Sequence, residues 1–441
     1  MMSPPSLLIR RARIILPSGE FIVGDVLTRD RQIVKVSPSE INDETPTHVI
    51  DADGFTLLPG VIDPQVHFRE PGLEHKEDLF TASCACAKGG VTSFLEMPNT
   101  RPLTINQEAL DDKLQRASGK CLVNYGFFIG ATTDNLSELL QATPTPGIKI
   151  FMGSMHGPLL VDPQEILEGI FANGEILIAV HAEDQTRLRQ RREEFANIHD
   201  VAIHSQIQDN QAALIATKRA LKLSKKYRRR LHILHMSTAE EANLLREDKP
   251  EWVTAEVTPQ HLFLNTDAYE KIGSLAQMNP PLRTSHDNEV LWQALLDGVI
   301  DFIATDHAPH TLEEKAQTYP KSPSGMPGVE TSLPLMLTAA VEGRCTVAQV
   351  VNWMSTAVAS AYSIPNKGLI APGYDADLVL VDLNSRKKVK GEEQATKCGW
   401  SSFEGWDLTG WPVTTIVGGE LAYHQGELNT KTRGRALTFK R

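Results

Sequence analysis

The stretch Asp63-Pro-Gln-Val-His-Phe-Arg-Glu-Pro-Gly72 follows directly on a hydrophobic run, residues 55–62. Such a run is typical of a buried strand, and the polar residues after it mark where the strand opens into a pocket. Because residues two apart in a strand share one face, Gln65, His67 and Arg69 are expected to project together. An imidazole beside a guanidinium predicts a metal ion held next to an anionic substrate.

The same pattern recurs along the chain, where β-rich apolar runs alternate with stretches of helical periodicity. Such an alternation predicts an α/β fold, a (β/α)8 TIM-like barrel whose reactive groups gather at the C-terminal ends of the strands. Helices are expected at residues 76–88, 163–172, 208–227, 238–248, 287–297 and 331–341. The eight predicted strands are residues 56–62, 92–97, 122–128, 147–152, 176–181, 231–235, 252–258 and 300–306.

The two ends of the chain differ from its middle. Short strands are expected at residues 6–16, 21–27 and 32–36, and again at 376–382, 411–417 and 420–424. Two β-rich ends that bracket a barrel would most simply meet in one sheet structure. We therefore predict a small β-sandwich domain from residues 1–56 plus 367–441, and a barrel domain from residues 57–366.

Composition excludes several classes of partner. The formal charge is 44 − 55 = −11, which argues against nucleic acid or an anionic membrane as a main partner. No run of apolar residues is long enough to span a bilayer. Five cysteines without paired spacing predict reduced thiols in a cytoplasmic protein.

Residues typical of metal ligands stand at the ends of several predicted strands. His67, His181 and His235 supply imidazoles and Asp306 a carboxylate, the donor types of a hydrolytic zinc site. Each histidine alone would more simply be a hydrogen-bonded structural residue, but three at strand ends of one barrel favour metal binding. Asp306 is also the predicted general base, and a helix N-cap is its alternative role.

Lys149 is an unusual member of this set. It lies in the apolar string Gly147-Ile-Lys-Ile-Phe-Met-Gly153, where an unpaired ammonium would be unfavourable. Burial lowers the pKa of a lysine, which makes the amine nucleophilic enough to take up carbon dioxide as a carbamate bridging two cations. The alternative is a buried ion pair, for example with Glu96.

A second group of residues suits an anionic substrate. Arg69 and Asn99 stand at adjacent strand ends, and a guanidinium with an amide makes a selective cradle for a carboxylate. His310 follows Asp306 by four residues and is expected to donate to the same carboxylate. Loop-stabilising hydrogen bonds are the alternative role of Asn99. His232 is expected to face away from His235 and to be structural.

With these residues assembled, the chain resembles the dihydroorotases of the amidohydrolase superfamily. The resemblance runs from Gly60 to the tail string Phe403-Glu-Gly-Trp-Asp-Leu-Thr-Gly410. The other matching strings are Val66-His-Phe-Arg-Glu-Pro-Gly72, Met97-Pro-Asn-Thr100, Ala182-Glu-Asp184, His235-Met-Ser-Thr238, Met278-Asn-Pro-Pro-Leu-Arg283 and Thr305-Asp-His-Ala-Pro-His310.

The resemblance implies reversible hydrolysis of the cyclic amide of L-dihydroorotate to N-carbamoyl-L-aspartate in pyrimidine biosynthesis, by metal-activated hydroxide with Asp306 as general base. It implies a small-molecule carboxylate substrate and a homodimer. One or two zinc ions would be held by His67, Lys149 as a carbamate, His181, His235 and Asp306. The substrate would be held by Arg69, Asn99, Asn279, His310 and the backbone around Ser324 and Gly325.

Gln65 departs from the family pattern, which usually carries His-x-His at this point. An amide oxygen is a weaker, neutral ligand for zinc than an imidazole, so we expect weaker metal binding or a mononuclear site. Gln65 also keeps open a different role, a catalytically weak dihydroorotase-like structural partner of aspartate transcarbamoylase. A third alternative, a cyclic amidase of the allantoinase or hydantoinase type, is disfavoured by Arg69 with Asn99.

Overall fold

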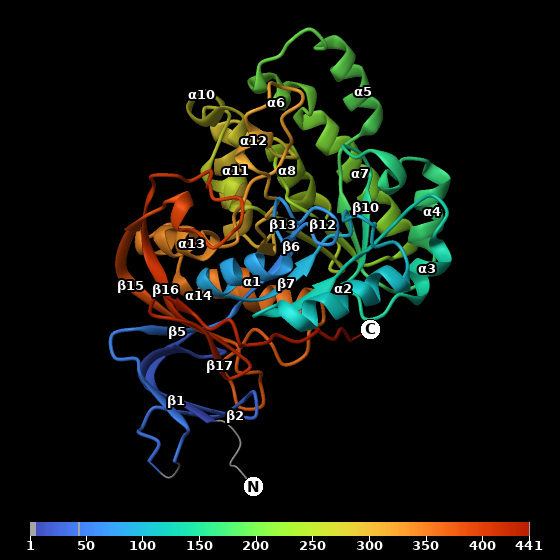
Figure 1. Cartoon of the computed structure of the whole chain (residues 1–441). Helices are drawn as coiled ribbons and strands as arrows, with labels where there is room; N and C mark the ends of the chain where they lie inside the picture. The colour runs from blue at the N-terminus through green and yellow to red at the C-terminus, as the bar shows by residue number, and fades with distance from the viewer. Residues whose placement is uncertain (1–5, 43–44, 441) are drawn as a thin grey trace.

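A computed structural model of the protein describes residues 6–42 and 45–440. The parallel strands at its centre lie within or close to the apolar segments predicted to be strands. Helices surround these strands, and a separate sheet stands to one side of them (Figure 1). The central strands are β6 (Val61–Val66), β7 (Val91–Glu96), β8 (Asn124–Phe127) with β9 (Ile129–Gly130), β10 (Ile148–Phe151), β11 (Ile178–His181), β12 (Leu231–Ile233), β13 (Val253–Val257) and β14 (Phe302–Ile303).

The two sheets of parallel strands are joined at two places into a barrel. Only Phe128 separates β8, the last strand of the sheet β6-β7-β8, from β9, the first strand of the sheet β9-β10-β11-β12-β13-β14. At the other end Val66 forms a parallel bridge with His307, and the His67 N–H donates to the His307 carbonyl at 2.7 Å. The predicted barrel is confirmed, and His67 lies at the seam between its first and last strands.

Capped helices follow most of the strands. Asp78 accepts hydrogen bonds from the first turn of α1, and Thr284 does the same for α11, so each strand-to-helix loop ends at a defined residue. The six predicted helical stretches correspond to helices that begin and end within a few residues of them. These are α1 (Leu79–Lys88), α4 (Gln164–Ala172), α7 (Asn210–Tyr227), α8 (Ala239–Asp248), α11 (Ser285–Leu296) and α13 (Ser332–Val341).

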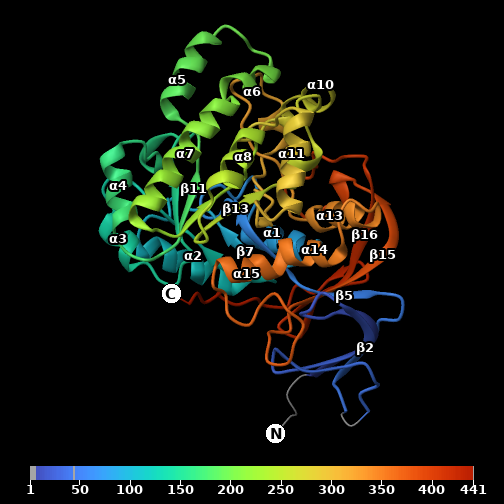
Figure 2. The ribbon, with the colours of Figure 1, turned by 180° about the vertical axis from the view of Figure 1, so that it is seen from behind.

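Both chain ends build the second sheet, as predicted. Its order is β18-β17-β16-β15-β5-β1-β2-β3, with β4 paired to β1. The two ends of the chain meet where β15 pairs with β5, and both views show their strands in one sheet (Figures 1 and 2). The strands are β1 (Ser6–Ile15), β2 (Phe21–Arg29), β3 (Gln32–Ser37), β4 (His48–Asp51), β5 (Thr56–Pro59), β15 (Leu378–Lys388), β16 (Asp407–Val417), β17 (Glu420–His424) and β18 (Glu427–Leu428).

One predicted strand is wrong in its extent. Residues 56–62 do not form a single barrel strand, because β5 pairs with β1 and β15 in the terminal sheet and only β6 enters the barrel. Gly60 makes the transition, and a Cβ there would lie 2.2 Å from Thr92 Oγ1. The terminal sheet therefore reaches Pro59, and the division into two domains near residue 56 stays a prediction.

Two further features bear on the chain's surroundings. Within residues 6–42 and 45–440, no helix has the length and apolar character needed to cross a lipid bilayer. All five cysteines are buried and carry free thiols, as their unpaired spacing predicted.

Candidate active site

A cavity of about 140 Å³ opens at the C-terminal ends of the barrel strands, the face where barrels of this type carry their reactive groups. Every residue predicted to hold metal or substrate lines it, with the exception of His310. Positions far apart in the sequence therefore converge on one space. The predicted residues that line it are Gln65, His67, Arg69, Asn99, Lys149, His181, His235, Asn279, Asp306, Ser324 and Gly325.

Three of the residues that line this cavity have strained backbone conformations. Arg69 (φ +68°), His235 (φ +36°) and Asp306 (φ +46°) all adopt the left-handed conformation just beyond the ends of their strands. Each such non-glycine residue costs about 1–3 kcal/mol and persists only where the surroundings enforce it. Strain that turns three cavity-lining residues sharply at the same rim indicates a functional site.

His67 and Asp306 face each other across the barrel seam. His67 Nδ1 lies 2.6 Å from the side-chain oxygen Oδ1 of Asn99, so Nδ1 carries the ring hydrogen. Burial lowers the pKa of His67, which favours the neutral ring with a bare Nε2. That Nε2 lies 3.1 Å from Asp306 Oδ1, so two lone-pair atoms face each other in the arrangement that a bound cation satisfies.

A second pair of donors lies on β11 and just after β12. His181 Nε2 lies 2.8 Å from the buried carboxylate of Glu183, which leaves Nδ1 as the lone-pair atom. This Nδ1 is 2.9 Å from His235 Nε2, and among the described residues nothing bonds to His235 Nδ1. Burial holds the pKa of His235 well below its usual range, so its ring is neutral. Two imidazoles whose ring nitrogens converge on one point suit zinc.

Lys149 is buried beside these residues without a counter-ion. Its side chain is 1% exposed, and Nζ bonds to nothing in the part of the chain that the structure describes. The ion pair with Glu96, the alternative drawn from the sequence, does not form, because Glu96 pairs with Lys113 at 2.7 Å. Burial lowers the pKa of Lys149 to about 7, so much of the amine is neutral and nucleophilic near neutral pH.

Gln65 also leaves one atom unsatisfied. Its Nε2 donates to Asp306 Oδ1 at 3.1 Å, whereas its Oε1 is buried and accepts nothing from residues 6–42 or 45–440. No three His, Cys, Asp or Glu side chains of those residues form a complete metal-binding group by themselves. The unsatisfied Gln65 Oε1 and Lys149 Nζ, together with the facing nitrogens of His181 and His235, nevertheless fit a divalent cation, provided that Lys149 takes part as a carbamate.

On the substrate side, His310 lies behind Arg69. Lys76 Nζ donates to His310 Nδ1 at 3.1 Å, so His310 Nε2 carries the hydrogen and donates to the Ser324 carbonyl at 3.0 Å. Arg69 Nε donates to the Pro309 carbonyl at 3.1 Å. His310 thus supports the loop around Ser324, and its direct contact with substrate stays a prediction.

Two residues of this site, Ser154 and His204, were not predicted from the sequence. Ser154 lines the cavity and accepts a hydrogen bond from Asn279 Nδ2 at 3.0 Å, while His204 Nε2 lies 2.8 Å from Asn279 Oδ1. Burial lowers the pKa of His204 to about 4, so the neutral ring holds the amide. Ser154 could have been inferred from its place just beyond β10, whereas His204 sits in the four-residue α6 (His204–Ile207), which has no periodic signal.

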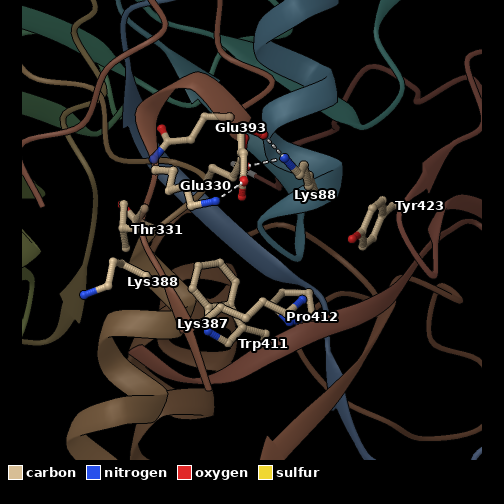
Figure 3. A pocket seen from close by; sticks show the side chains of 12 residues that line it. Lys88, Glu330, Thr331, Lys387, Lys388, Glu393, Trp411, Pro412 and Tyr423 are labelled. Carbon is tan, nitrogen blue, oxygen red and sulfur yellow. Dashed lines mark hydrogen bonds and ion pairs between the residues drawn. The ribbon is translucent and has the colours of Figure 1, made fainter. Parts of the chain in front are cut away.

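A second hollow lies away from the barrel rim, between α1, α13 and the terminal sheet (Figure 3). It contains none of the predicted site residues, and its basic groups have partners. Lys88 pairs with Glu330 at 3.0 Å, and Lys387 lies 5.5 Å from the centre of the Trp411 ring. This hollow therefore offers no comparable chemistry.

Comparison with known proteins agrees with this geometry. Residues 56–422 match the model of the amidohydrolase family. The chain belongs to the amidohydrolase family. This amidohydrolase is 35% identical to the dihydroorotase of Methanosarcina acetivorans over 97% of the chain and 92% of that protein. It is 36% identical to the dihydroorotase of Halobacterium salinarum, over 85% and 88% respectively.

Solved structures give the same fold. The L-hydantoinase of Arthrobacter aurescens superposes on this amidohydrolase with a TM-score of 0.93 at 30% identity, covering 98% of this chain and 99% of that one. The dihydropyrimidinase of Brevibacillus agri gives a TM-score of 0.91 at 27% identity, covering 99% and 100%. The predicted likeness to dihydroorotases, and the predicted class of hydrolases acting on cyclic amides, are confirmed.

Proposed function

We propose that this amidohydrolase is a dihydroorotase, which interconverts L-dihydroorotate and N-carbamoyl-L-aspartate in pyrimidine biosynthesis. The observation that carries the proposal is the shared cavity, where the guanidinium of Arg69 lies together with Lys149, the histidines and Asp306. A guanidinium suits the carboxylate that distinguishes dihydroorotate from other cyclic amides. The names of the relatives at 33–36% identity support the same activity.

We propose that the cofactor is Zn²⁺, one ion or two, held by His67, His181, His235, Asp306 and a carboxylated Lys149. When bound, zinc would polarise the ring amide carbonyl and lower the pKa of the attacking water. The unsatisfied atoms Gln65 Oε1 and Lys149 Nζ support this assignment.

The chain's own residues then bind substrate and move protons. Arg69 Nη1 and Asn99 Nδ2 bond to no other described residue and are free to donate to the substrate carboxylate, which orients the ring. Asp306 Oδ2 is likewise free of bonds to described residues. It takes a proton from the attacking water and returns it to the amide nitrogen as the C–N bond breaks.

Turnover measurements test this proposal against both alternatives. The purified, zinc-restored protein is expected to hydrolyse dihydroorotate at least about 100-fold faster than dihydrouracil, the same ring without the carboxylate, because the cradle would be left unpaired. A preference for dihydrouracil or hydantoin would favour an amidase of the hydantoinase type. No turnover of any of these rings would favour the structural partner of aspartate transcarbamoylase.

Replacing Gln65 by histidine is expected to raise zinc retention. The imidazole would supply a nitrogen where the amide now presents only a weak oxygen ligand. The apparent affinity for zinc is expected to rise by about tenfold. It is measured from the zinc bound per chain after dialysis against a mild chelator. The matched control is Gln260→His, because Gln260 is buried near the same rim, donates to the Thr305 carbonyl at 3.1 Å and does not line the cavity. Equal zinc retention in both variants would contradict the special place given to Gln65.

We further propose a homodimer in the cytoplasm. Five buried free thiols support a reducing compartment. Sedimentation of the zinc-loaded protein measures the assembly directly, and a monomer at all concentrations would reject the dimer.

A further inference from the structure

Lys315 is a buried lysine that forms no ion pair with any described acidic residue. It ends α12 (Leu312–Lys315), its side chain is 1% exposed, and burial lowers its pKa to about 7. Its Nζ donates to three backbone carbonyls, those of Gln277 at 3.0 Å, Pro323 at 2.9 Å and Gly325 at 3.1 Å. An ammonium has three hydrogens, so each is used once.

The three carbonyls belong to two separate segments that both reach the cavity. Gln277 precedes Asn279, and Pro323 and Gly325 flank Ser324. The same two segments are also joined directly, because the Gly325 N–H donates to the Gln277 carbonyl at 2.9 Å. Lys315 therefore fastens one wall of the cavity from behind, without lining the cavity itself.

On the side facing Ala308, the wall segment at Gly325 is closely packed. Gly325 has a φ of +142°, and a Cβ there would lie 2.3 Å from the Ala308 carbonyl oxygen. The Trp400 ring lies 5.7 Å from Lys315 Nζ, and its Nε1–H donates to the His310 carbonyl at 2.7 Å. Lys315 thus lies between the cavity wall and the Trp400 ring, which is hydrogen-bonded to His310, the residue in contact with Arg69.

The charge of Lys315 also affects the protonation of His310. Burial holds the pKa of His310 well below its usual range, and the charges of Arg69, Lys76 and Lys315 lower it further. Three basic side chains thus lie around His310. Glu314 is an acidic group beside them and pairs with Lys76 at 3.0 Å. A buried ammonium is unfavourable, and an apolar side chain of similar length would fill the space more easily.

We propose that Lys315 is a positioning residue that sets the preference for carboxylate-bearing substrates. It clamps the segments of Asn279 and Ser324 into one wall and adds positive charge behind Arg69. It touches neither substrate nor metal. This inference rests on the proposed function in one respect, that the ligand of Arg69 carries a carboxylate.

Steady-state kinetics of Lys315→Met test the inference, with Lys321→Met as the control because Lys321 is exposed in the same loop. For Lys315→Met we expect KM for dihydroorotate to rise about tenfold or more with kcat within about threefold, since a displaced wall weakens binding. The preference for dihydroorotate over dihydrouracil is expected to fall by the same factor. Unchanged preference in a folded, zinc-loaded Lys315→Met protein would overturn the inference, as would an equal effect in Lys321→Met.

Two additions keep the test decisive. Lys315→Gln, which removes the charge but keeps amide donors, is measured in case the methionine variant does not fold. Equilibrium binding of orotate and of uracil is measured beside the kinetics, because binding does not depend on turnover. If the wild-type protein binds orotate in preference to uracil but hydrolyses no ring, the proposed function alone is rejected. If a Lys315 variant keeps this binding preference, the role of Lys315 is rejected.

Discussion

Replacing Lys149 by methionine is expected to reduce hydrolysis of dihydroorotate by about 10³-fold or more while leaving the protein folded and at least as stable. Methionine has a similar length but neither an amine nor a charge. Lys149 Nζ is buried, lies 4.5 Å from the centre of the Phe151 ring and has no hydrogen-bond partner among the described residues. Its removal therefore takes away an unfavourable buried charge and breaks no hydrogen bond or ion pair between described residues. Loss of activity without loss of stability is the signature of a residue kept for chemistry.

The same substitution at Lys113 is the matched control. Lys113 is as deeply buried as Lys149, but it pairs with Glu96 at 2.7 Å and donates to the Met97 carbonyl at 3.3 Å. Lys113→Met leaves a buried carboxylate alone, and the free energy of unfolding is expected to fall by about 3–5 kcal/mol. Urea unfolding of both zinc-free variants, with zinc content measured before chelation, makes the comparison. Equal destabilisation by the two substitutions would show that Lys149 is structural.

The effect of Lys149 on stability also has a defined pH dependence. Its pKa is about 7 in the folded protein, against about 10.4 in an unfolded chain. Between these values the unfolded chain holds a proton that the folded protein has lost, so the wild type gains stability as pH rises. The advantage of Lys149→Met is therefore expected to be largest below about pH 7 and to shrink toward about pH 10. Unfolding of zinc-free protein at about pH 6 and about pH 9 measures this difference.

The residues that could be predicted from the sequence share a local signal. Lys149, His181 and His235 each stand in or directly after a short apolar run, and the strand period decides which way each points. Once eight such runs predict a barrel, all of these ends must meet at one rim. The fold, and the convergence of the candidate metal ligands on one cavity, were therefore accessible without any knowledge of long-range contacts.

The features that escaped prediction depend on distant partners. The split between β5 and β6 is set by pairing of Thr56–Pro59 with β15, more than 300 residues away, and Pro59-Gly60 is the local sign of it in the sequence. The orientation of His310 in its loop follows from Lys76 and Ser324. Glu96 pairs with Lys113 and not Lys149, a choice made by helix packing that no strand period encodes.

Asparagine at position 306 is expected to lower kcat by about 10²–10⁴-fold, with KM changed by no more than about threefold. The amide oxygen can still accept from Gln65 Nε2, which now bonds to Asp306 Oδ1 at 3.1 Å, so the local packing is kept. An amide cannot take the proton of the attacking water. Stopped-flow or steady-state turnover of dihydroorotate measures the loss, and zinc content measured on the same samples separates proton transfer from metal binding.

Asp63→Asn is the control for this substitution, because Asp63 lies on the neighbouring strand β6 but does not line the cavity. Asp63 accepts from the Thr305 hydroxyl at 2.6 Å and the Thr305 N–H at 3.1 Å, and burial raises its pKa to about 7. An amide oxygen can keep most of these bonds, so kcat is expected to stay within about tenfold of the wild type. Similar losses from both variants would mean that Asp306 acts by supporting the seam. A loss confined to Asp306→Asn with zinc retained would assign the proton transfer to its carboxylate.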